Sequence, residues 1–113
     1  MLPAVANKKK VSSPAYEAFA EQLMVTNGDI ESGSLFGMPC LKINGKAFVG
    51  SFDGGAVFKL PEPEHAAALG LEGSVLFDPS GKGRPMKEWV VVTAVYEDRW
   101  PAFVAAALAY VFE

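Results

Sequence analysis

Cysteine and histidine are almost absent from the chain, which excludes several kinds of protein at once. Cys40 is the only cysteine and His65 the only histidine among the 113 residues. A single cysteine forms no internal disulfide, and together with a single histidine it cannot supply the four ligands of an ordinary structural zinc site. A chain of this length buries enough surface to fold without either. We therefore expect no disulfide, metal or cofactor, and a location in the reducing cytoplasm.

An excess of positive charge and long apolar segments are also missing. Ten lysines and arginines stand against thirteen acidic residues, so the net charge is −3, whereas nucleic-acid-binding domains are usually strongly basic. The longest charge-free run near either end, residues 100–112, is shorter than the roughly 20 residues that cross a bilayer. The first residues lack the apolar core of a signal peptide. The sequence thus predicts neither a membrane protein nor a tight nucleic-acid binder.

Hydrophobic residues make up half of the chain, which is typical of one globular domain of this length. Residues 1–12 show no hydrophobic periodicity and carry Lys8, Lys9 and Lys10, which repel one another. We predict a flexible tail over residues 1–12 and a single domain over residues 13–113.

The first helix is predicted directly after this tail. Ser13 is a favourable N-cap and Pro14 suits the first helical position. Asn27-Gly28 ends the helix, because both residues tolerate positive φ, and residues 29–33 are expected to form a loop. The apolar stripe of this helix consists of Tyr16, Phe19, Ala20, Leu23 and Met24.

The chain is predicted to end in a second long helix. Asp98 is expected to cap it, Pro101 lies in its first turn, and the helix runs to the end of the chain. A short helix is expected over residues 65–69. The buried stripe of the last helix is predicted to be Trp100, Phe103, Val104, Ala107, Leu108 and Val111.

Between the helices the hydrophobic pattern changes from a period of 3.6 to a period of two. Asn44-Gly45 is a strong signal for a type I′ hairpin turn, and Phe48 and Phe52 are expected on one face of the strand that follows it. The predicted strands are 34–37, 40–43, 46–52, 56–60, 75–77 and 86–92. This order predicts an α+β fold, an antiparallel β-meander sheet with the N- and C-terminal helices packed on one face.

The segment from Leu35 to Leu60, LFGMPCLKINGKAFVGSFDGGAVFKL, resembles the N-terminal domain of the TfoX/Sxy family. The matching residues are Phe36-Gly37, Gly45, Phe48, Phe58, Lys59 and Leu60, and later Phe77, Met86 and Trp89. The likeness extends over residues 14–112. Met38 replaces the second glycine of the family pattern, and Pro39 follows it.

The family takes its name from regulators of competence for DNA uptake, and full-length members continue into a separate C-terminal domain. For a stand-alone domain the resemblance implies a non-enzymatic interaction or regulatory role with an unidentified protein partner. The family defines no catalytic residues, so the resemblance assigns none here.

The chemistry-bearing residues of the chain favour structural roles. No nucleophile is placed near His65 by local spacing, and we expect a solvated side chain on a short surface helix. We expect Cys40 to be a small buried side chain and Trp89 to pack inside the domain. Aromatic rings can stack on bases as in sheet-surface RNA binders, but core positions are the expectation for Phe36, Phe48, Phe52 and Phe58.

A basic loop provides the alternative function. Lys82 and Arg84 lie in a glycine-rich segment, with Lys87 in the strand that follows. These three residues, together with Lys8–Lys10, would form a weak nucleic-acid-contacting or anion-contacting module. A P-loop is excluded, because a strand rather than a helix follows the glycines.

The side of the last helix opposite its buried stripe is uncharged. It consists of Ala102, Ala105, Ala106 and Ala109, with Tyr110 flanking them. An alanine face lets another backbone approach closely, so these residues are the candidate contact of a homodimer. Alanine is also the strongest helix former and needs no partner, so a monomer and a homodimer both stay open.

Overall fold

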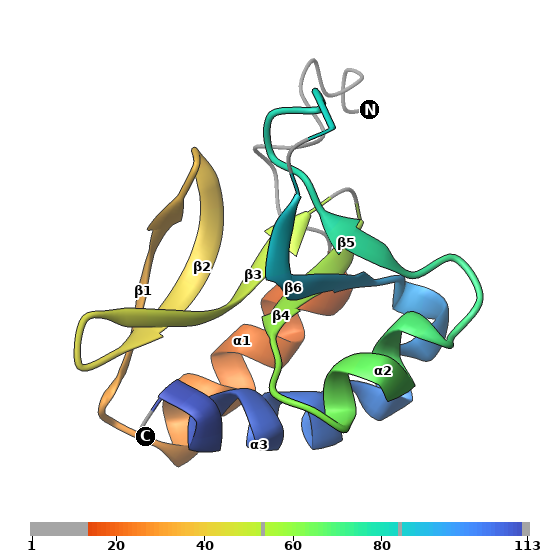
Figure 1. Cartoon of the computed structure of the whole chain (residues 1–113). Coiled ribbons are helices and arrows are strands. Elements are labelled where there is room, and N and C mark those ends of the chain that lie inside the picture. Colours follow the sequence, from red (N-terminus) through yellow and green to blue (C-terminus); the bar gives the residue numbers. More distant parts are fainter. Residues whose placement is uncertain (1–13, 53, 84, 112–113) are drawn as a thin grey trace, which may run out of the picture.

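The computed structural model describes residues 14–111 apart from positions 53 and 84 (Figure 1). The predicted tail over residues 1–12, the Ser13 cap and Glu113 lie outside the described residues. The elements in chain order are α1 (Pro14–Thr26), β1 (Ile30–Leu35), β2 (Met38–Ile43), β3 (Lys46–Phe52), β4 (Gly55–Lys59), α2 (Glu64–Leu69), β5 (Val75–Phe77), β6 (Met86–Val92), a 3₁₀ segment (Ala94–Arg99) and α3 (Trp100–Val111).

The strands form one antiparallel six-stranded sheet in the order β1-β2-β3-β4-β6-β5. Helices α1 and α3 pack against one face of this sheet, with α2 beside α3 (Figure 1). The predicted α+β class, with both terminal helices on one face of an antiparallel sheet, is therefore confirmed. None of the helices within the described residues is long and apolar enough to span a lipid bilayer.

Two type I′ turns close the first two hairpins. Asn44 and Gly45 have φ values of 53° and 77°, as the Asn-Gly pair predicts. Phe36 and Gly37 have φ values of 52° and 80°, and the sequence did not predict this turn, because phenylalanine is uncommon at positive φ.

Strand β1 corrects the prediction of a loop over residues 29–33. It is an edge strand that pairs with β2 from Ile30–Ile43 to Leu35–Met38. Glu31, Ser32 and Ser34 are exposed polar residues, and Gly33 is half-exposed. The apolar alternation expected of a strand is therefore missing. β2 begins at Met38 rather than at Cys40. Pro39 is tolerated because it lies beyond the last residue pair between β2 and β3, so its missing N–H removes no hydrogen bond between these two strands.

A β-bulge in β3 corrects the expectation that Phe48 and Phe52 share a face. Leu41 pairs with Val49 but Lys42 pairs with Ala47, so Phe48 is an extra residue. Phe48 and Val49 both enter the helix-facing core, and the alternation is inverted after them. Phe52 consequently packs on the opposite face.

The sheet carries an apolar cluster on each face. The helix-facing core contains residues from all three helices and from every strand except β5 among its fully buried members. Trp89 is 6% exposed, which confirms its predicted burial, but it lies on the other face. The buried members of this second cluster are Met38, Val57, Phe77, Trp89 and Val91.

The sheet curls around the second cluster. In a flat sheet, β2 and β5 would be separated by four strand spacings, about 19 Å. The ring of Phe36, in the turn before β2, nevertheless lies 6.2 Å from the ring of Phe77 in β5. The face without helices is therefore concave, and the β1–β2 hairpin closes over it.

The last helix begins differently from the prediction. A 3₁₀ segment over Ala94–Arg99 precedes α3 and contains Asp98, so Asp98 is not the helix cap. The segment is interrupted at Tyr96, whose φ and ψ are −105° and 28°. Pro101 is accommodated because the first turn of a helix has no intrahelical use for its backbone N–H groups.

Candidate interaction site

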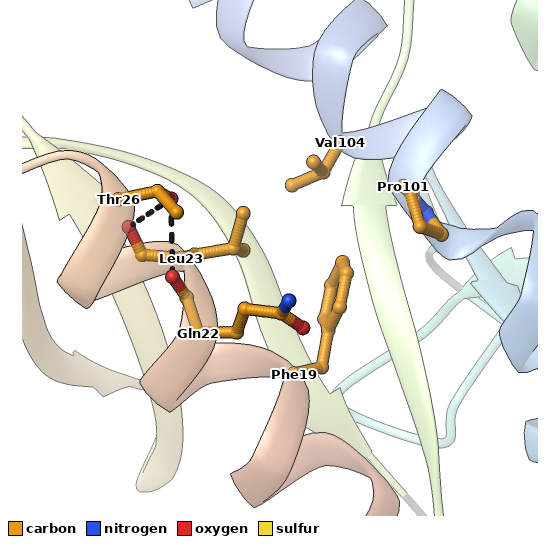
Figure 2. A pocket seen from close by; sticks show the side chains of 6 residues that line it. All are labelled: Phe19, Gln22, Leu23, Thr26, Pro101 and Val104. Atoms are coloured by element: carbon orange, nitrogen blue, oxygen red, sulfur yellow. Dashed lines mark hydrogen bonds between the residues drawn. The ribbon is translucent and has the colours of Figure 1, made fainter.

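A groove runs between α1 and α3 on the outer side of the helix layer. Two residues of the α1 stripe, Tyr16 and Ala20, are buried against the sheet, while Phe19 and Leu23 are half-buried and face α3. Figure 2 shows the side chains of Phe19 and Leu23 pointing toward Val104 and Pro101. The groove has a volume of about 290 Å³ and is lined by Phe19, Gln22, Leu23, Thr26, Pro101 and Val104.

The walls of the groove are fixed by the packing beneath them. The Phe19 ring lies 5.4 Å from the Trp100 ring and 6.5 Å from the Phe58 ring, both of which are buried in the core. At the end of α1 the Thr26 hydroxyl donates to the carbonyl oxygens of Gln22 and Leu23, at 3.0 and 3.1 Å (Figure 2). These two bonds orient the Thr26 side chain, which is one of the residues that line the groove.

The lining is apolar at its base and neutral at its rim. Phe19, Leu23 and Val104 supply hydrocarbon surface, and Gln22 and Thr26 are exposed polar residues at the mouth. None of the described residues that line the groove is charged. Such a site suits an uncharged apolar group, whose hydrocarbon would be removed from water there.

The structure separates the five residues that were predicted as a dimer contact. Ala102, Ala105 and Ala109 are exposed on α3, whereas Ala106 is half-buried against the core. Tyr110 turns toward the sheet: its hydroxyl donates to Glu88 Oε2 at 3.0 Å, and the Lys59 ammonium lies 5.8 Å from its ring centroid. Only the three exposed alanines remain a continuous uncharged strip.

The basic loop between β5 and β6 is organised by its own carboxylate. Asp78 Oδ1 accepts from the Ser80 hydroxyl at 2.8 Å and from the backbone N–H groups of Ser80 and Gly81. Asp78 Oδ2 accepts from the Gly83 N–H at 2.8 Å. These amides are therefore already bound to an internal anion and do not form an open phosphate cradle.

The three residues of the predicted anion contact lie on or near this loop. Lys82 and Lys87 are exposed, on the loop and on β6. Arg84 lies outside the described residues. The interpretation of these residues as an anion contact stays a prediction that rests on their side-chain charges.

His65 is not the solvated side chain that the sequence predicted. Its side chain is 16% exposed, and its Nε2–H donates to the backbone carbonyl of Lys87 at 2.7 Å. Its Nδ1 lies 3.4 Å from Glu62 Oε2. The imidazole thus connects α2 to β6, a contact across 22 positions that local sequence spacing does not reveal.

Cys40 is buried, as predicted, and 1% exposed. Burial raises the pKa of its thiol, and the Lys42 ammonium opposes this shift only in part. A protonated thiol is a poor nucleophile. Within the part of the chain that the structure describes, no three His, Cys, Asp or Glu side chains are grouped so as to hold a metal ion.

Two of the four phenylalanines predicted for the core depart from that prediction. Phe48 and Phe58 are fully buried, and Phe52 is half-buried on the concave face. Phe36 is 59% exposed at the tip of the β1–β2 hairpin. The exposure of Phe36 follows from the type I′ turn, which was not predicted.

Comparisons of the chain with models of known protein families, with curated proteins and with solved structures find no match. The groove itself was missed at the sequence level. Phe19, Leu23 and Val104 were predicted as core residues of their helices. Val104 is buried, but nothing in the sequence indicates that Phe19 and Leu23 are only half-buried beside α3.

Proposed function

We propose that the protein is a non-enzymatic interaction domain of the TfoX N-terminal type, acting in the cytoplasm. In this proposal the groove between α1 and α3 binds an apolar side chain of a partner protein. The observation that carries the proposal is the neutral, apolar lining of the groove between two helices of the layer. The regulatory part of the proposal rests on the resemblance over residues 35–60.

The alternative, a weak nucleic-acid contact through the basic loop, is supported less well. Asp78 occupies the backbone donors of that loop. The alternative relies on Lys82, Arg84 and Lys87 together with Lys8–Lys10, and a few phosphate contacts of this kind give only weak, salt-sensitive binding. The net charge of −3 adds a long-range repulsion from nucleic acid.

Site-specific photo-crosslinking in cells that express the protein tests the groove. A photoreactive residue at Gln22, on the rim, should give a discrete adduct of higher mass, whereas one at Glu72, which is exposed and does not line the groove, should not. Thr26→Arg places a cation at the mouth of the groove and should abolish the Gln22 adduct. Thr26→Ser keeps the hydroxyl and should retain it.

The result that contradicts the proposal is a Gln22 adduct that survives Thr26→Arg, or equal adducts from both positions.

Fluorescence anisotropy with random duplex DNA at low and high salt tests the alternative. Micromolar binding that disappears at high salt would favour the nucleic-acid module.

A further inference from the structure

Strand β1 leaves one side of its backbone without a neighbouring strand, because it is the first strand in the sheet order (Figure 1). Leu35 and Met38 flank the two-residue turn and so exchange ladder hydrogen bonds. Every second residue then points its amide and carbonyl away from β2, namely Ile30, Ser32 and Ser34. The Ile30 N–H indeed donates out of the ladder, to Asn27 O at 3.1 Å.

The outward backbone groups at the centre of β1 are accessible. Ser32 and Ser34 are exposed, and among the described residues nothing accepts from or donates to their outward amides and carbonyls. Proteins usually guard such an edge with proline, lysine, a bulge or a very short strand. β1 has six residues, contains no proline, lysine or bulge, and carries Glu31 as its one charged side chain, whereas the opposite edge strand, β5, has only three residues.

We propose that β1 pairs with β1 of a second copy of this chain, in antiparallel orientation about a two-fold axis at Ser32. In this register Ser32 lies opposite Ser32 of the second copy and Ser34 lies opposite Ile30. Glu31 lies opposite Gly33 of the second copy. The outward amides and carbonyls of the two Ser32 residues then bind one another, and the two sheets become one.

The charges at this edge are complementary in that register. Lys42 stands opposite Glu31 within one chain, yet its side chain leans across Gly33 toward the edge: Lys42 Cε lies 3.1 Å from the position that a Cβ on Gly33 would take. Neither Glu31 nor Lys42 forms an ion pair with another described residue. Gly33 lies opposite Glu31 of the second copy, so the Lys42 ammonium of each chain lies next to the Glu31 carboxylate of the other chain. The two-fold axis produces two such ion pairs.

Neighbouring registers are less favourable. If the two-fold axis lies at Glu31 instead of Ser32, Glu31 stands opposite Glu31 of the second copy. Like charges directly across a strand pair are destabilising. If the axis lies at Gly33, Glu31 stands opposite Leu35 of the second copy, away from Lys42. This self-complementarity of Glu31 and Lys42 is the reason to infer a second copy rather than an unrelated extended peptide.

Sedimentation equilibrium over tens to hundreds of micromolar protein tests the pairing. The wild type should dimerise reversibly, since one strand pair gives a small interface and a modest affinity. Ser32→Pro removes an outward N–H without touching the β1–β2 ladder. It should raise the dissociation constant by about tenfold or more, and Ser32→Ala should leave it unchanged.

A charge exchange identifies the register. Glu31→Lys alone and Lys42→Glu alone should each weaken the dimer, and the double variant should restore it. The matched control is Ala105→Glu with Ala109→Glu, which places charges on the exposed strip of α3 and should leave the dimer intact. Circular dichroism confirms that each variant is folded.

Three results would overturn the proposal. They are a wild type that is monomeric at the highest concentration, a dimer that survives Ser32→Pro, and a dimer that the α3 variant disrupts. The test is independent of the groove between α1 and α3, which lies on the helix layer rather than on the sheet edge.

Discussion

The thiol of Cys40 lies on the concave face between two glycines, Gly33 on β1 and Gly50 on β3. Burial holds its pKa above the ordinary value, with the Lys42 ammonium lowering it in part. The thiol of the unfolded chain therefore ionises first as the pH rises. The contribution of the buried, neutral thiol to the free energy of unfolding is complete below the pKa of the unfolded thiol, about 8.5. This contribution is lost as the pH rises through the folded-state pKa.

We expect this titration to appear in the pH dependence of stability. The free energy of unfolding of the wild type should fall more steeply between about pH 8 and pH 10 than that of Cys40→Ala. Denaturation by guanidinium at a series of pH values measures both curves. Parallel curves would mean that the thiol has the same pKa in the folded and unfolded chain.

Residue environments were predictable where neighbours in the sequence determine them. Cys40 and Trp89 lie in strands of apolar and β-branched residues, and their burial was predicted correctly. His65 was not, because its partner is a backbone carbonyl of β6. Phe36 was not, because its exposure depends on a turn that phenylalanine rarely forms.

At the scale of elements, the loop between β5 and β6 depends on one carboxylate. Asp78→Ala removes the acceptor for the amides of Ser80, Gly81 and Gly83. We expect a loss of about 1 kcal/mol in the free energy of unfolding, the scale of a cap or turn side chain in a solvent-accessible loop. Thermal denaturation measures this loss, and amide exchange at Gly83 should accelerate.

Asp78→Asn is the matched control, since its amide oxygen still accepts hydrogen bonds and its charge is removed. Its one carbonyl oxygen can still accept from Ser80 and Gly81, but its NH2 group cannot accept from the Gly83 N–H, so protection should be retained at Gly81 and reduced at Gly83. Equal exchange rates for the alanine variant and the wild type would show that the carboxylate does not hold the loop. If Asp78→Ala instead gained affinity for inorganic phosphate, the freed amides would be the cause.

The elements that could be predicted are those with strong periodicity or a defined turn signal. The 3.6-residue period correctly predicted the helices α1 and α3. The Asn44-Gly45 pair correctly predicted the turn between β2 and β3. The edge strand β1 and the bulge at Phe48 could not be predicted, because an edge strand needs no apolar alternation and a bulge shows only in the pairing with β2. The groove was equally hidden, since it depends on the spacing of two helices.

For the molecule as a whole, the helices of the described residues pack on the other face of the sheet, and the turn at Phe36 reaches over the concave cluster. Trp89 reports on this cluster and Trp100 on the helix-facing core. In a Trp100→Phe background the emission of Trp89 should be shifted to the blue of indole in water, because Trp89 is 6% exposed.

The closure itself can be tested in the same background. Phe36→Ser removes an exposed ring that contacts Phe77 and should increase quenching of Trp89 by acrylamide, with little change in the melting temperature. Phe36→Tyr keeps the ring and serves as the control. Unchanged quenching in the serine variant would mean that the hairpin tip does not shield the cluster.

The contact between Phe36 and Phe77 also has a consequence for the order of folding. It joins a hairpin at one border of the sheet to the strand at the other border, and every strand between them must be paired before the two rings can meet. Contacts that depend on long chain closures form slowly. The β1–β2 and β2–β3 hairpins join nearer partners, so we expect these hairpins to pair before the rings of Phe36 and Phe77 meet.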